Sequence, residues 1–254
     1  MKQDQLLISG EIAATAVIIF TMGYFCRTSD SDALKWILAP TAWWAGILSG
    51  IYIEYLPHQG YVNYFHQFLI APSCAGIRFM LLTFLMLAFS FRLSDYLCGN
   101  RQVDSERDDK ENTNMRKECL WFGFSIVFSY ISTVFVNGIR IVASVYLPDI
   151  LERAHLMDGW LTPDRLHTVI GTVTYFSFLC VIYLAACWLR GRSEKRDGLL
   201  VPVFWYLLIV LALPFIKRMY HNEWEGFGQY AVSIVGVCGS VYALLAVVGR
   251  IRRR

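Results

Sequence analysis

The chain has 254 residues, of which 56% are hydrophobic and 17% charged, and its formal net charge is +3. A soluble domain of this length carries more charge and interrupts its apolar segments sooner, so the composition excludes an ordinary soluble enzyme. The basic residues flank apolar segments, so the positive charge reflects membrane orientation and we expect no nucleic-acid partner.

Seven apolar segments approach or reach the roughly 20 residues that a helix needs to cross a hydrocarbon layer of about 30 Å. We therefore predict an all-α fold, a polytopic transmembrane helical bundle of about seven spans, with residues 1–254 forming a single integral-membrane domain. The first segment is interpreted as a retained span, because it is long and lacks a small-x-small cleavage site. The segments are residues 6–26, 36–56, 75–95, 119–147, 166–189, 199–215 and 230–249.

The longest polar stretch is a charged loop at about residues 97–118, between the third and fourth predicted spans. Cytoplasmic loops are enriched in Lys and Arg, so the distribution of these residues gives an orientation. Of the 23 Lys and Arg residues, 16 lie on the side of this loop and 5 on the other. This predicts a multi-pass protein of the cytoplasmic (inner) membrane with its N-terminus outside and its C-terminus in the cytoplasm.

The cysteines and histidines show no metal-ligand spacing. None of the 7 cysteines belongs to a C-x-x-C pair, and none of the 5 histidines belongs to an H-E-x-x-H motif. We therefore expect no metal and no cofactor. The predicted orientation instead brings a thiol, a guanidinium and an imidazole to similar depth on the outer side, from three different helices: Cys74, Arg140 and His167.

Each of these residues has a local sequence that suits chemistry. Pro72 fits the first position of a helix, which puts Cys74 in the first turn, where backbone N–H groups and the helix dipole favour a thiolate. Thr162 is a suitable N-cap and Pro163 a suitable first residue for the next helix, leaving His167 one turn inside as an acid/base.

Asn137 and Arg140 are three residues apart and are expected to share a helix face. An arginine there can donate to a carbonyl that becomes an oxyanion, an effect worth roughly 3–4 kcal/mol for one donor in a soluble protease. Taken singly, each residue also has an ordinary interpretation: an inert thiol at a helix start, an interfacial histidine, and an arginine that extends to the headgroups.

At these residues the sequence resembles the exosortase/archaeosortase family of integral-membrane cysteine transpeptidases. The family pattern has a Cys followed by Gly-Ile, then Asn-x-x-Arg-Ile, then a His that leads a span. The corresponding segments are CAGI at residues 74–77, NGIRI at 137–141 and HTVIGTVTYF at 167–176. The resemblance covers about residues 50–190, and it departs from the family at Ala75, where many members carry Ser.

The resemblance implies a membrane cysteine protease and transpeptidase with its active site on the outer (periplasmic) side. Its partners would be membrane-anchored proteins whose C-terminal sorting signal comprises a short motif (Pro-Glu-Pro or a relative), a transmembrane helix and a basic tail. Cys74 would form a thioester with the substrate, His167 would be the acid/base, and Arg140 would stabilise the oxyanion. Asn137 would act on the substrate only indirectly, by supporting Arg140.

Two further features lie beside the candidate nucleophile. Arg78 follows Cys74 by four residues, and we hypothesise that Arg78 or Arg140 pairs with an acidic residue of the substrate. The stretch at residues 53–74 has no Lys or Arg and is rich in tyrosine, which is typical of a segment lying along the membrane interface. It contains the rival bases His58 and His66.

The sequence leaves other functions open. A non-catalytic membrane protein that binds or assembles tail-anchored partners would not need the thiol of Cys74. A small-molecule transporter would need more ionisable residues at mid-membrane and paired broken spans. The sequence does not fix the oligomeric state, the substrates, or whether water or an amine resolves the thioester.

Overall fold

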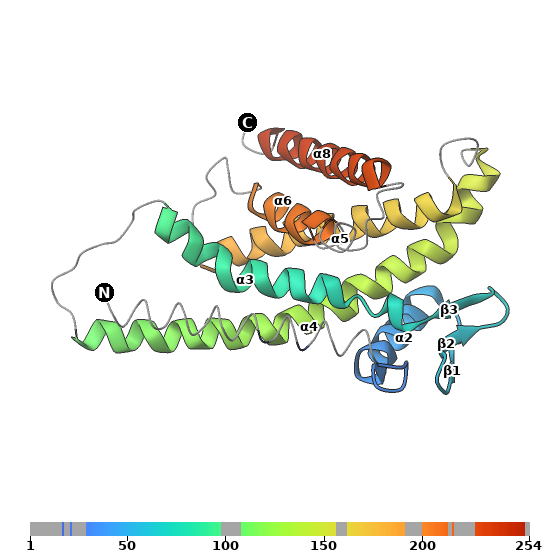
Figure 1. Ribbon diagram of the computed structural model, residues 1–254, viewed down its shortest axis with the longest axis horizontal. Helices are drawn as coiled ribbons and strands as arrows, with labels where there is room; N and C mark the ends of the chain where they lie inside the picture. The colour runs from blue at the N-terminus through green and yellow to red at the C-terminus, as the bar shows by residue number, and fades with distance from the viewer. Residues whose placement is uncertain are drawn as a thin grey trace. The chain divides into compact units, whose positions relative to one another are not determined.

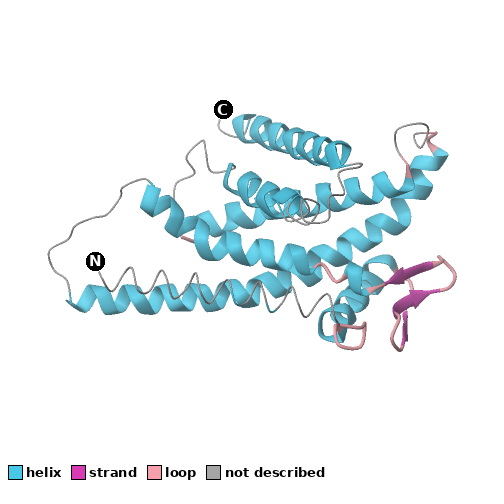
Figure 2. Cartoon of the chain, in the orientation of Figure 1, coloured by secondary structure: helices cyan, strands magenta, loops and turns pink. Residues whose placement is uncertain are grey.

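The computed structural model is mostly helical, with one small sheet (Figures 1 and 2). It divides into two compact units, Met1–Ile77 and Arg78–Arg254. That these units act as a single domain stays a prediction. The structure describes residues 17, 21, 29–97, 108–155, 162–190, 200–212, 215 and 227–251.

Four described helices are long and apolar enough to cross a membrane, which indicates a membrane protein. They coincide with the predicted third, fourth, fifth and seventh spans, whereas the apolar helix in the sixth, Leu200–Leu211, is shorter. Nearly all of the predicted first span, residues 6–26, lies outside the described residues. The four helices are Pro72–Ser90, Cys119–Arg153, Arg165–Leu189 and Phe227–Leu244.

In the first unit, helix α2 (Lys35–Ser49) is shorter than the span predicted at residues 36–56. It ends where Gly50 adopts a left-handed conformation with φ of 68° and donates its N–H to the Gly46 carbonyl at 2.9 Å. Its 15 residues measure about 22 Å. That length is less than the roughly 30 Å of a hydrocarbon layer, so the full span predicted here is not confirmed.

The stretch predicted to lie along the membrane interface forms a three-stranded antiparallel sheet in the order β1 (Glu54–Leu56), β2 (Gly60–Asn63), β3 (Phe68–Ile70), drawn in magenta in Figure 2. The all-α prediction is therefore wrong for this part of the chain. Gly60, with φ of 126°, makes the sheet possible, because a Cβ there would lie 2.3 Å from the Ile70 carbonyl oxygen. Helix α2 packs against β2.

Tyr61, in the middle of the sheet, gives the first unit a pH-dependent stability. Burial raises the pKa of Tyr61 above its ordinary value of 10.0. At higher pH the unfolded chain loses this proton while the folded chain keeps it, so stability falls as pH rises past about 10. We expect a Tyr61→Phe variant to show a smaller fall in its thermal midpoint between about pH 9 and about pH 11 than the wild type. A Tyr64→Phe variant, which changes an exposed tyrosine, is the control; equal pH dependence in all three proteins would contradict the prediction.

The second unit is a helical bundle in which α5 contacts α4, α6 and α8 (Figure 1). Its core contains Phe79 and Met86 from α3 together with Phe176 and Leu179 from α5, all nearly or completely inaccessible to solvent. The helices of this unit are α3 (Ile77–Leu97), α4 (Asp108–Arg153), α5 (Pro163–Leu189), α6 (Leu200–Leu207), its π-helical continuation Leu208–Ala212, and α8 (Phe227–Ile251).

Helix α4 begins at Asp108, inside the stretch that we predicted as a charged loop at about residues 97–118. The residues from Asp108 to Cys119 include neither Gly nor Pro, and Asp108 and Asp109 suit the positive end of a helix dipole. The prediction of a loop followed the high charge of this segment and overlooked its compatibility with a helix.

Four hydroxyl groups in the middle of α4, those of Ser125, Ser129, Ser132 and Thr133, donate to carbonyls of the same helix. Ser125 donates to the Trp121 carbonyl at 2.8 Å, and Thr133 donates to the Ser129 carbonyl at 2.7 Å. Such bonds let polar side chains lie in an apolar environment without a partner from another helix. The next polar side chains along α4 bind a neighbouring helix instead, and they form the candidate site.

Candidate active site

Asn137 and Arg140 of α4 meet His167 and Tyr175 of α5 in one polar cluster, in which the two α4 residues are buried, Tyr175 is half-buried and His167 is exposed. Asn137 is inaccessible to solvent and Arg140 is 9% exposed. Arg140 Nη1 donates to Asn137 Oδ1 at 3.3 Å and to Tyr175 Oη at 3.1 Å. The predicted shared face of Asn137 and Arg140 is therefore confirmed, and the structure brings these two residues together with His167.

His167 is positioned by the start of α5. Thr162 caps this helix, accepting a hydrogen bond from the Arg165 backbone N–H at 3.4 Å, and Pro163 occupies the first turn, as the sequence predicted. His167 follows one turn later, and its Nε2 lies 2.7 Å from Arg140 Nη2.

The contact between Arg140 and His167 fixes the proton on the imidazole. A guanidinium has five N–H donors and no acceptor, so His167 Nε2 must accept the hydrogen bond. The imidazole is therefore neutral with its proton on Nδ1. For Nε2 to accept a proton during catalysis, Arg140 Nη2 must first turn to another acceptor.

Tyr175 completes the cluster, and the sequence analysis did not identify it. Its hydroxyl donates to Asn137 Oδ1 at 2.8 Å while accepting from Arg140, and its ring stacks on Phe79 of α3 with centroids 4.8 Å apart. Tyr175 follows His167 by eight residues, so both lie on one face of α5. This helical spacing was the available signal.

Removing the Tyr175 hydroxyl is expected to loosen the cluster. A Tyr175→Phe variant removes the 2.8 Å bond to the buried Asn137 oxygen, which is shorter than the 3.3 Å bond from Arg140. We expect a loss of about 1–2 kcal/mol in unfolding free energy, measured by thermal or denaturant unfolding in detergent. The control is Tyr146→Phe, which removes a hydroxyl from an exposed tyrosine on α4. Equal stability of the two variants would contradict the role of this hydroxyl.

Cys74 belongs to the first unit, and its position differs from the prediction in detail. It ends a short 3₁₀ turn, Pro72–Cys74, with Pro72 in the first turn as expected. Its backbone N–H bonds to the Ala71 carbonyl at 2.8 Å, and α3 begins only at Ile77, after Gly76 with φ of 71°. Cys74 thus lies in the 3₁₀ turn before α3, at the start of the candidate span Pro72–Ser90, instead of in the first turn of the α-helix. That it reaches Arg140 and His167 stays a prediction.

The thiol of Cys74 is partly exposed and forms no disulfide among the described cysteines. Its Sγ lies 4.0 Å from Ser73 Oγ. Arg78 is the second residue of α3, and it is exposed. Its pairing with an acidic substrate residue stays a hypothesis.

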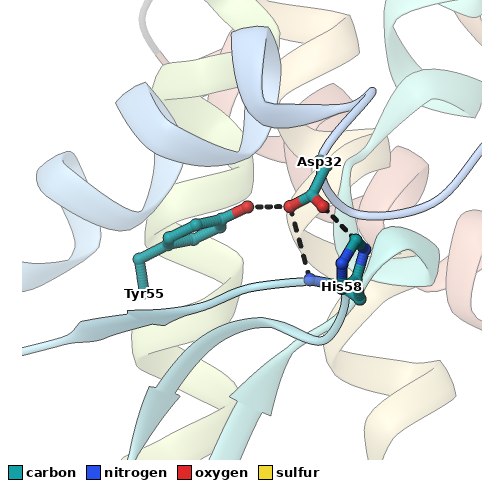
Figure 3. A network of polar contacts seen from close by, with 3 residues as sticks. All are labelled: Asp32, Tyr55 and His58. Carbon is teal, nitrogen blue, oxygen red and sulfur yellow. Dashed lines mark hydrogen bonds and ion pairs between the residues drawn. The ribbon is translucent and has the colours of Figure 1, made fainter.

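The rival base His58 lies in a second polar cluster, at the turn between β1 and β2 (Figure 3). Asp32 accepts hydrogen bonds from the Tyr55 hydroxyl and, at 3.3 Å, from the His58 backbone N–H, and its other oxygen lies 2.7 Å from His58 Nδ1. The His58 side chain is 76% exposed. Asp32 precedes α2, so these contacts connect the turn between β1 and β2 to the start of that helix.

Comparisons with protein-family models, with curated proteins and with solved structures found no match for this chain.

Proposed function

We propose that the protein is an exosortase-like membrane cysteine protease and transpeptidase that cleaves C-terminal sorting signals. The observation that supports this most is the 2.7 Å contact between the buried guanidinium of Arg140 and the imidazole of His167, two of the three residues that the sequence motifs single out. A buried guanidinium with an imidazole as its close partner is costly in an apolar environment. Such a cost is usually offset by a function in binding or catalysis.

In the proposed reaction the Cys74 sulfur attacks the scissile carbonyl, forming a C–S bond, and its proton passes to His167. The carbonyl oxygen becomes an oxyanion, to which Arg140 donates. When the intermediate collapses, the C–N bond breaks and the leaving amine takes the proton back from His167, leaving a thioester. Water or an acceptor amine then attacks the thioester and releases Cys74 as a thiol.

Arg140 and His167 are coupled in this scheme. While Arg140 Nη2 donates to His167 Nε2, that nitrogen is unavailable as a base. An oxyanion offers Arg140 a better acceptor, and its negative charge also lies between the guanidinium and the imidazolium that forms. The base is thereby released as the substrate carbonyl takes up charge.

We also propose the finer membrane topology that the sequence indicates: about seven spans in the cytoplasmic (inner) membrane, the N-terminus outside and the C-terminus in the cytoplasm. The asymmetry of 16 against 5 basic residues supports this orientation. It puts the start of α5, and with it His167, on the outer side.

A groove between α5 and α8 supports a substrate with its own transmembrane helix. The groove has a volume of about 750 Å³, and Arg165, which bonds to Gln229 at 3.2 Å, lies in its lining. Small residues such as Gly228, Gly236 and Ser233 line its α8 side, and small residues allow helices to approach closely in membranes. Arg165 lies about 200° around α5 from His167, so the groove suits the tail helix and not the scissile bond.

The same groove favours a second candidate function, a non-catalytic membrane protein that binds or assembles tail-anchored partners. This function needs the groove but neither the thiol nor the base. The two functions differ in whether a covalent intermediate forms.

The test is a search for an acylated Cys74. A membrane protein with a tripartite C-terminal signal, encoded in the same genome, is co-expressed, and peptides containing Cys74 are examined by mass spectrometry. The proposal predicts an added mass equal to the upstream product, removed by neutral hydroxylamine because thioesters react with it. A bound but uncut partner and an unmodified Cys74 would favour the binding function instead.

A further inference from the structure

One face of α5 is built around the guanidinium of Arg140. His167, Gly171 and Tyr175 recur every four residues and therefore form a single stripe on the helix. The two outer members bind the guanidinium directly, His167 through Nη2 and Tyr175 through Nη1. Gly171, between them, has no side chain, and a Cβ there would lie 3.5 Å from Arg140 Nε.

The donors of Arg140 are unevenly used. Nη1 and Nη2 have partners, whereas Nε is shielded from solvent and has no hydrogen-bond partner. Arg140 is only 9% exposed. Nevertheless, no carboxylate among the described residues pairs with its guanidinium. A buried charge without a counter-charge is rare, and an unpaired N–H beside it is a further cost.

We propose that the space over Gly171 is an anion-binding position, where Arg140 Nε donates to an anionic oxygen of a ligand. The oxygen belongs to a carboxylate of a polypeptide or to the oxyanion that forms at a scissile carbonyl; the second source rests on the proposed function. Hydrogen bonds to Tyr175 and Asn137 hold Nη1, and Nε lies beside Gly171, where an added Cβ would be 3.5 Å away. Gly171 is therefore a residue that admits the ligand.

Gly171→Ala tests this position without disturbing its neighbours. A separation of 3.5 Å is ordinary van der Waals contact, so the methyl group fits and covers Nε while every hydrogen bond of the cluster remains. Alanine also suits a helix interior better than glycine. The matched control is Gly123→Ala on α4, where a Cβ meets no atom within 4 Å.

The first measurement uses formate as the carboxylate probe and needs no substrate. The thermal midpoint of the full-length protein in detergent is followed as sodium formate replaces sodium chloride at constant ionic strength. A carboxylate site predicts a saturable rise in the wild type and in Gly123→Ala, and an apparent affinity at least about tenfold weaker in Gly171→Ala. If this result is obtained and the wild type processes no substrate, the anion site stands and the proposed function fails.

The second measurement is the kinetics of substrate processing, which detects the oxyanion source. Loss of an oxyanion donor lowers kcat by about 100-fold or more at unchanged KM, whereas loss of a carboxylate contact in the bound substrate raises KM. Either change in Gly171→Ala, absent from Gly123→Ala, supports the inference. If Gly171→Ala matches Gly123→Ala in both formate binding and kinetics, the inference is overturned.

Discussion

Replacing Cys74 by alanine is expected to abolish cleavage of a co-expressed substrate, with a loss of at least about 10⁴-fold in rate. Removing a nucleophile from a soluble serine protease costs about 10⁶-fold in kcat, and residual activity there comes from binding and the oxyanion site alone. Cys74→Ser is expected to be nearly as inactive, because a hydroxyl gives up its proton far less readily than a thiol. The measurement is the mass of the substrate protein in membranes from each strain.

The control for this experiment is Cys119→Ala, which removes an exposed thiol at the start of another candidate span. It should process substrate like the wild type, and all variants should reach the same level in the membrane. Normal cleavage by Cys74→Ala would leave Cys74 as a small residue in a 3₁₀ turn, and the enzymatic proposal would then be wrong.

Arg140→Met is expected to lower the processing rate by about 10²–10³-fold without lowering stability. The catalytic loss is that of one oxyanion donor. Stability should be kept or increased, because methionine removes a buried charge that pairs with no carboxylate in the described part of the chain, and the bond from Tyr175 to Asn137 remains. Processing kinetics and thermal unfolding, measured on the same preparation, provide the two quantities.

Arg140→Lys separates charge from geometry. Lysine keeps the positive charge but presents a compact ammonium, which cannot hold the planar arrangement that joins Tyr175 to His167. We expect Arg140→Lys to be almost as inactive as Arg140→Met. A marked fall in thermal stability of Arg140→Met with little change in rate would instead show that Arg140 is a structural residue.

The sequence predicted the parts of the structure that depend on local signals. The cap at Thr162, the shared face of Asn137 and Arg140, and the spans of α3, α5 and α8 all follow from helical spacing and apolar length. The contact between Arg140 and His167 joins two helices. No local signal predicts such a contact; the charge of the loops indicated only that both residues lie at a similar depth on the outer side.

The missed features have identifiable physical causes. The strands at residues 54–70 were hidden because an apolar, aromatic stretch suits a membrane interface as well as a small sheet, and only the turn around Gly60 distinguishes them. Tyr175 and Gly171 were missed because a tyrosine and a glycine in an apolar span are common. Their spacing from His167 becomes informative only when Arg140 is known to face that stripe.

The unbroken length of α4 has a mechanical consequence. Its 46 residues measure about 69 Å, more than twice a hydrocarbon layer of about 30 Å, so a long portion of this helix extends beyond the membrane core. Its proline, Pro148, comes after Arg140, so no proline interrupts the hydrogen-bond ladder from Asp108 to the candidate site. The helix is thus a stiff rod, and a displacement of its Asp108 end would be transmitted along it to the turn that carries Arg140.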